Sequence, residues 1–218
     1  WSNQNLRRLA SKLRSRTILA HVRAASDGLS VSEENTHPFC DGTLAFMHNG
    51  ELGGFRATRR RLIAELDGAA FEVIQGSTDS EYLFALFTHF HDEAADVPDP
   101  AERLARALAE TFARALDTVG RTTELSYLNV AVSDGRASVV SRFTNDEAQY
   151  AESLHYHTGR AYVCEDGVCR MIAPDAAGHA VIVASERLSD DEGWCEVPPN
   201  HMIVVREDRT IDVRPLTL

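Results

Sequence analysis

The order of strand-like and helix-like segments is the feature of this sequence that most restricts its fold. Short apolar runs typical of buried strands come first, at residues 17–25 and 43–47. Helical spacing of apolar residues follows at 56–66, 79–90 and 98–119, after an initial helical pattern at 2–15. Strand-like runs then return at 125–132, 137–143, 155–164, 179–185 and 201–213. Strands grouped on either side of the helices predict an α+β fold with antiparallel sheets rather than a doubly wound parallel sheet.

Two of these predictions rest on specific local signals. The apolar residues of 98–119 recur every four positions from Leu104 to Leu116, which gives one apolar stripe along a helix. The Asp134-Gly135 pair between 125–132 and 137–143 predicts a hairpin, because Asp-Gly tolerates the positive φ of a tight turn.

The composition narrows the class of partner. A chain of 218 residues can bury a core within one domain, and its net charge of −11 repels nucleic acid and anionic membrane surfaces. No apolar run is long enough to cross a bilayer. The four cysteines do not form a disulfide scaffold, and Cys164 and Cys169 have the wrong spacing for a zinc site. We therefore expect a cytoplasmic protein with neither nucleic-acid nor membrane partners.

Three polar positions stand at the ends of predicted elements, where a scaffold can direct them into a cleft. Arg23 lies in an apolar run, and its guanidinium suits a substrate carboxylate. Asn49 and Gly50 close the next run, where a side-chain amide and an unobstructed backbone N–H can stabilise an oxyanion. Asp79 begins a helix and can accept hydrogen bonds from an ammonium group. Together these groups fit a γ-glutamyl amide.

Each of these signals has a plainer structural interpretation when it is taken alone. An Asn-Gly pair is most often a simple turn. Arg23 could equally form an internal ion pair, and Asp79 could cap its helix. The functional interpretation therefore depends on their combination and order.

Four motifs in this order resemble the class II glutamine amidotransferases: HVRAAS at 21–26, NTHPF at 35–39, FMHNG at 46–50 and GSTDSE at 76–81. The resemblance implies an αββα sandwich of two antiparallel sheets, of the N-terminal-nucleophile hydrolase type. It implies that Arg23 holds the α-carboxylate, that Asn49 and Gly50 form the oxyanion hole, and that Asp79 binds the α-amino group. Ser26 and His37 would support the pocket, and neither a metal nor an organic cofactor is expected.

The segment 180–208 resembles the small, stand-alone amidotransferase-like proteins, which include fungal-type glutathione-degrading subunits. Glutamine and glutathione present the same γ-glutamyl head group, so the motifs do not separate these two substrates. A γ-glutamyl hydrolase of a thiol-biosynthetic pathway such as that of ergothioneine is a third interpretation. A non-catalytic γ-glutamyl-binding subunit is the alternative from another class, and a partner subunit or an oligomer is compatible with all of them.

The family's nucleophile is a cysteine at the mature amino terminus, whereas residue 1 here is Trp1. The resemblance therefore predicts that 1–218 is a single type-2 glutamine amidotransferase domain that is N-terminally incomplete, without its first strand. An internal cysteine has no free α-amino group to serve as base, so none is an equivalent substitute. Cys40 is expected to be a packing or surface thiol.

Other polar groups are assigned to structural roles. The pairs His89 and His91, and His155 and His157, lack further ligands for a metal, and the first pair diverges on a helix. Four arginines of 56–61 are expected on a solvated helix face. His21 and His48 could act as general bases, but strand alternation favours a supporting role in which each points away from its functional neighbour.

Overall fold

The computed structural model describes residues 8, 12, 14–22, 33–120, 124–147, 150–165, 168–173 and 179–218. The helices are the short 3₁₀ turns η1 (Glu33–Asn35) and η2 (Ala94–Asp96) and the α-helices α2 (Phe55–Ala64), α3 (Gly68–Glu72), α4 (Asp79–Glu93) and α5 (Pro100–Val119). The strands are β1 (Phe39–Asp41), β2 (Leu44–Glu51), β3 (Tyr127–Ser133), β4 (Ser138–Arg142), β5 (His155–Gly159), β6 (Ala161–Glu165), β7 (Val168–Ile172), β8 (Ala180–Ala184), β9 (Cys195–Glu196), β10 (His201–Val205) and β11 (Ile211–Pro215).

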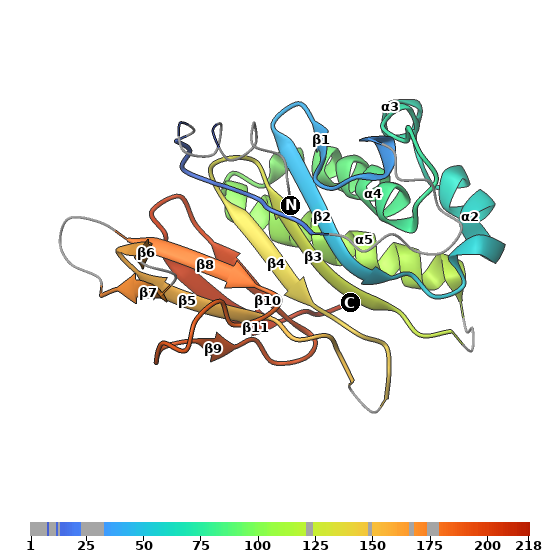
Figure 1. Cartoon of the computed structure of the whole chain (residues 1–218). Coiled ribbons are helices and arrows are strands. Elements are labelled where there is room, and N and C mark those ends of the chain that lie inside the picture. The colour runs from blue at the N-terminus through green and yellow to red at the C-terminus, as the bar shows by residue number, and fades with distance from the viewer. Residues whose placement is uncertain are drawn as a thin grey trace.

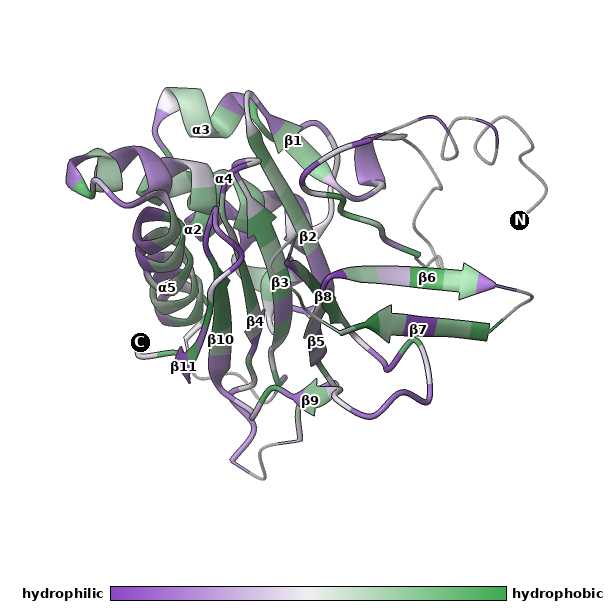
Figure 2. Cartoon of the chain, turned by 90° about the vertical axis from the view of Figure 1, so that its left-hand side faces the viewer, coloured by the Kyte–Doolittle hydropathy of each residue, from purple (hydrophilic) through white to green (hydrophobic). Residues whose placement is uncertain are grey.

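The strands form antiparallel sheets in layers with the helices (Figure 1). The main sheet has six strands in the order β1-β2-β3-β4-β10-β11, and a second sheet has the order β8-β5-β9. Figure 2 shows α4 and α5 on one side of the main sheet and β5 and β8 on the other, with the β6–β7 hairpin projecting away. The predicted α+β class with antiparallel sheets is therefore confirmed.

The two long helices begin where the sequence provides caps. The Thr78 side chain accepts a hydrogen bond from the backbone N–H of Glu81, and the Glu81 carboxylate accepts one from the backbone N–H of Thr78, so α4 starts with a capping box. Asp99 accepts from the N–H of Ala101 at the start of α5, and Pro100 occupies the first turn. These caps satisfy N–H groups that have no partner within the helix.

The core lies between the helices and the main sheet. Phe46 of β2 meets Phe84 and Phe87 of α4 at ring-centroid distances of 5.4 and 6.0 Å, and all three side chains are buried. Burying one such side chain contributes about 1.5–3 kcal/mol. A smaller cluster around Leu154 and Ile203 fills the space between the two sheets.

Four of the predicted strands need correction. Residues 17–22 of the strand predicted at 17–25 have no strand structure, and Ile18 and Val22 are exposed, so this part does not pair with the sheet. Strand β2 does not stop at His48, because its pairing with β3 continues to Glu51. The predicted strand at 155–164 divides into β5 and β6 at a bend at Arg160, and the predicted strand at 201–213 divides into β10 and β11, which are joined by a turn.

A disulfide joins Cys164 and Cys169 across the β6–β7 hairpin, a pairing that the sequence analysis did not expect. Among the described residues, no helix is long and apolar enough to cross a membrane.

Candidate active site

Asn49 and Gly50 are consecutive residues at the end of β2, where successive side-chain positions face opposite sides of the main sheet. The register places Asn49 opposite Asn129 and Gly50 opposite Leu128 of β3. Because side chains alternate along a strand, Asn49 lies on the face away from α4, whereas Phe46 and His48 face the helices. Asn49 is exposed, so its side-chain amide is accessible to a ligand.

Gly50 is required by its surroundings. Its φ is +146°, and a Cβ at this position would lie 1.8 Å from the carbonyl oxygen of Tyr127 and 3.1 Å from Nε2 of His48. No L-residue with a side chain fits this conformation and this space. Gly50 is a candidate site residue for its open backbone N–H, and the positive φ and the nearby carbonyl oxygen of Tyr127 are a separate reason for glycine there.

His48 supports this strand end from the helix side. Its Nε2 lies 3.1 Å from the carbonyl oxygen of Tyr127, and its Nδ1 lies 3.0 Å from Oγ of Ser80. A carbonyl only accepts, so Nε2 carries the proton and Nδ1 of the neutral ring accepts from the Ser80 hydroxyl. Burial lowers the pKa of His48, although the charge of Asp79 opposes that shift, and the neutral ring is therefore favoured. The predicted supporting role of His48 agrees with this geometry.

Asp79 joins the start of α4 to the chain that follows Gly50. Its Oδ2 accepts from the backbone N–H of Leu52 at 2.8 Å, and its Oδ1 accepts from the N–H of Ser80 at 2.9 Å. Oδ2 keeps a further lone pair, so the carboxylate can still accept a hydrogen bond from a ligand ammonium. The structure thus brings Asp79 and the Asn49-Gly50 end of β2 together.

The loop before Asp79 is held by two side chains that the sequence analysis did not select as site residues. Glu81 is buried, and its carboxylate accepts from the backbone N–H groups of Gln75, Gly76 and Thr78. Asn35 accepts from the N–H of Ser77. The Thr-x-x-Glu spacing is a capping-box signal and indicates Glu81. Asn35 opens the NTHPF motif, but no local signal shows that its side chain holds this loop.

His37 lies two residues after Asn35 and is buried in an aromatic cluster. Its ring centroid lies 4.4 Å from that of His21 and 4.6 Å from that of Phe39. It therefore braces the segment whose Asn35 side chain reaches the loop before Asp79. Arg23 and Ser26, the other two predicted substrate-binding residues, lie outside the described residues.

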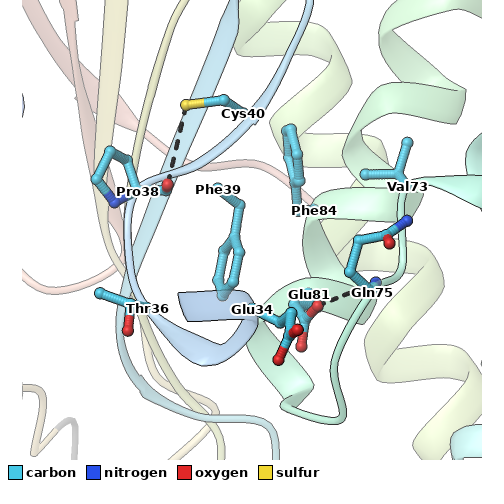
Figure 3. Close-up of a pocket in the computed structure, with 9 residues that line it drawn as sticks. All are labelled: Glu34, Thr36, Pro38, Phe39, Cys40, Val73, Gln75, Glu81 and Phe84. Carbon is cyan, nitrogen blue, oxygen red and sulfur yellow. Dashed lines mark hydrogen bonds between the residues drawn. The ribbon is translucent and has the colours of Figure 1, made fainter. Parts of the chain in front are cut away.

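A pocket of about 300 Å³ opens beside this loop (Figure 3). Phe39 and Phe84 form apolar walls, Gln75 and Glu81 come from the loop and α4, and Cys40 stands at the β1 side. Cys40 is an exposed free thiol whose Sγ lies 3.8 Å from the carbonyl oxygen of Pro38. Asn49, Gly50 and Asp79 do not line this pocket, so it is distinct from the predicted oxyanion and ammonium positions.

Two further observations concern the histidine pairs and the arginines of α2. No group of three or more potential metal ligands occurs in the part of the chain that the structure describes. The four arginines of α2 are exposed, as expected for a solvated face: Arg56, Arg59, Arg60 and Arg61.

Known proteins are similar to this chain in sequence and in fold. The family model described as "Glutamine amidotransferases class-II" matches residues 4–216. The probable glutamine amidotransferase DUG3 of Saccharomyces cerevisiae is 36% identical over 230 residues, which cover 99% of this chain and 64% of the yeast protein. The chain thus spans less than two thirds of the length of that relative.

Two further relatives extend the comparison. The gamma-glutamyl-hercynylcysteine sulfoxide hydrolase of Mycolicibacterium smegmatis is 26% identical over 216 residues, covering 99% of this chain and 71% of that protein. The structure of a glutamine aminotransferase class-II domain protein from Silicibacter pomeroyi is 32% identical with a TM-score of 0.68, covering 99% of this chain and 81% of its own.

Proposed function

Because this chain belongs to the class II glutamine amidotransferases, we propose that it binds a γ-glutamyl amide and hydrolyses it to glutamate and an amine. In this proposal Arg23 holds the α-carboxylate, Asp79 binds the α-ammonium group, and Asn49 with the N–H of Gly50 stabilises the oxyanion. Ser26 and His37 support the pocket. The complete αββα sandwich, with a first strand preceding these residues, belongs to the same proposal.

One contact carries the argument. The 2.8 Å hydrogen bond from the N–H of Leu52 to Asp79 ties the proposed ammonium position to the strand end that holds Asn49 and Gly50. A γ-glutamyl group has its α-ammonium at one end and its scissile carbonyl at the other. A rigid connection between the two recognition positions therefore suits this head group and holds the carbonyl in a fixed place.

Hydrolysis of the amide needs a nucleophile. The resemblance to the family implies that this nucleophile is a cysteine at the mature amino terminus. Its thiolate attacks the γ-carbonyl carbon, and the negative charge that forms on the oxygen is stabilised by Asn49 and Gly50. The C–N bond then breaks, the amine leaves with a proton, and a γ-glutamyl thioester remains. Water cleaves the thioester, which returns the thiol and releases glutamate.

The substrate class follows from the head group rather than from the rest of the molecule. One relative is named a probable glutamine amidotransferase and another a gamma-glutamyl-hercynylcysteine sulfoxide hydrolase. Glutamine, glutathione and a γ-glutamyl conjugate of hercynylcysteine are accordingly the three substrates to compare. A partner subunit that accepts the amine, or an oligomer, is compatible with this proposal.

The test measures glutamate release from these three compounds by protein that carries its native amino terminus. Asn49→Ala should lower kcat by about 10²- to 10³-fold, because it removes an oxyanion donor. Arg23→Ala should mainly raise KM, because the α-carboxylate is bound in the ground state as well as in the transition state. Arg59→Ala is the matched control, since Arg59 is an exposed arginine of α2.

Two results would contradict parts of the proposal. An unchanged KM in Arg23→Ala would remove Arg23 from the site. Binding of γ-glutamyl compounds without glutamate release would favour the non-catalytic binding subunit instead.

A further inference from the structure

A row of polar side chains crosses the main sheet on the face that carries Asn49. Asn49 of β2 lies directly opposite Asn129 of β3, and residues opposed in this way have Cβ atoms about 4.5–5.5 Å apart on the same face. Arg142 of β4 continues the row, because Arg142 and Asn129 both donate to the carbonyl oxygen of Glu152. The neighbouring positions on β2 and β4, Met47 and Val140, are apolar.

Asn129 is buried, with 6% of its surface exposed, and its carboxamide is fixed through its nitrogen. Nδ2 donates to the carbonyl oxygens of Glu152 at 3.1 Å and Ser153 at 3.2 Å, which uses both of its hydrogens. Oδ1 is also buried and has no hydrogen-bond partner within the described part of the chain. A buried acceptor without a donor is unfavourable by about 1–3 kcal/mol, so such a group calls for a functional or structural reason.

Arg142 makes the orientation of Asn129 rigid. Its buried guanidinium donates to the carbonyl oxygens of Ala151, Glu152 and Val197, and it pairs with Glu196 at 2.6 Å. The loop that holds Nδ2 of Asn129 is therefore anchored to β4. A rotation that exchanged Nδ2 and Oδ1 would set the oxygen against two carbonyl oxygens, so the carboxamide has one favourable orientation.

We propose that a rotation of the exposed Asn49 side chain brings its Nδ2 to Oδ1 of Asn129, so that Oδ1 accepts a hydrogen bond from Nδ2 and orients the Asn49 amide for the oxyanion. This inference rests on the proposed function, in which Asn49 donates to the substrate oxygen. An Asn side chain has two hydrogens on nitrogen, so one bonds to Asn129 and the other points to the substrate. Without this acceptor the Asn49 amide is free to turn its own carbonyl oxygen toward the oxyanion, which would be repulsive. Asn129 is thus a positioning residue that acts through Asn49.

A double-mutant cycle tests this coupling. Asn129→Ala should lower kcat roughly tenfold and leave KM nearly unchanged, because the oriented amide matters most in the transition state. The double variant Asn49→Ala/Asn129→Ala should be no slower than Asn49→Ala alone, since the positioned group is already absent. Losses that multiply in the double variant, or an unchanged kcat in Asn129→Ala, would overturn the proposal.

The control and the second variant separate positioning from folding. Ser141→Ala removes a buried hydroxyl of β4 that bonds to the backbone of β3, so it should lower stability while kcat is retained. Asn129→Ser keeps a polar group near the loop, but its hydroxyl is too short to reach Asn49. It should therefore share the loss in kcat while folding better than Asn129→Ala.

A measurement without turnover distinguishes this proposal from the proposed function. In ¹⁵N-labelled protein the side-chain amide signals of Asn49 are identified by their loss in Asn49→Ala. We expect their hydrogen exchange to accelerate in Asn129→Ser and to stay unchanged in Ser141→Ala. If the parent protein releases no glutamate, the proposed function fails and this measurement still decides the hydrogen bond. Identical exchange in Asn129→Ser and the parent overturns it.

Discussion

At the scale of single residues, the carbonyl oxygen of Tyr127 is the point around which the end of β2 is built. It lies 3.1 Å from Nε2 of His48, and it leaves no room for a side chain at position 50. His48 and Gly50 are the two neighbours of Asn49 at the end of β2. The position of the proposed oxyanion donors is therefore set by packing against β3 and does not depend on a bound ligand.

We predict that Gly50→Ala lowers the free energy of unfolding by roughly 2–4 kcal/mol, from backbone strain and the contact with Tyr127. Gly42→Ala is the matched control, because Gly42 also has a positive φ of +55° but nothing lies within 4 Å of an added Cβ. That control should cost only about 1 kcal/mol. Urea unfolding followed by circular dichroism measures both, and equal losses in the two variants would contradict the packing argument.

The sequence indicated part of the site at this scale. Asn49, Gly50 and Asp79 could be selected because their polar or glycine character interrupts apolar or helical patterns at element ends. Asn129 could not, because it stands within an apolar strand and its hydrogen-bond partners are Glu152 and Ser153, which are distant in sequence. The partners of Asp79 and Asn35 likewise come from other elements and are visible only in the fold.

At the scale of elements, the start of α4 fixes the loop that leads to Asp79. The Glu81 carboxylate gathers three backbone N–H groups of this loop as well as the hydroxyl of Thr78. Gly76 leaves space for that carboxylate, because a Cβ there would lie 2.5 Å from Oε2 of Glu81. The helix cap and the loop are therefore one unit.

We predict that Glu81→Gln lowers the free energy of unfolding by about 2–3 kcal/mol, because an amide NH₂ would face N–H donors in a buried site. Glu72→Gln, an exposed substitution on α3, should change stability by less than about 0.5 kcal/mol. Hydrogen exchange of the Gly76 and Thr78 amides gives the local measurement. Unchanged protection in Glu81→Gln would show that the loop is held by other contacts.

The elements that the sequence predicted well are those with local signals. Helix α5 has a cap and a single apolar stripe, and the Asp134-Gly135 hairpin has a turn that only a few residue types allow. The end of β2 was predicted too early because Asn-Gly is locally a turn signal, whereas pairing with β3 keeps it in the sheet. The strand predicted at 17–25 shows the opposite error, since an apolar sequence forms a strand only where a neighbouring edge accepts it.

At the scale of the whole molecule, two histidines connect stability to pH: the buried His48 and the half-buried His91. Burial lowers the pKa of His48, and burial together with the charge of Arg103 lowers that of His91. The pKa of each histidine in the folded protein therefore lies below the ordinary value of 6.5. At pH values between the folded pKa and 6.5, the unfolded chain binds more protons than the folded protein. This contribution to stability is fully present above that value and is lost as the pH falls toward the folded pKa values.

We predict that the urea concentration at the unfolding midpoint decreases as the pH is lowered from neutral to about 5.5. His48→Gln should reduce this slope, and adding His91→Gln should reduce it further, whatever each substitution does to stability at neutral pH. A slope that is the same in the double variant and the parent would assign the pH dependence to other groups.

The hydrogen bond between Asp79 and the N–H of Leu52 makes the two ends of the proposed ligand interdependent. A ligand ammonium group would bind the same carboxylate that accepts the hydrogen bond from Leu52. Binding of the α-ammonium group would therefore affect the chain after Gly50, next to the proposed oxyanion donors. Substrate analogues without the α-amino group would then have a lower kcat as well as a higher KM. Selectivity for γ-glutamyl compounds would then arise in the chemical step as well as in binding, because the α-ammonium group of the substrate influences the position of the oxyanion donors.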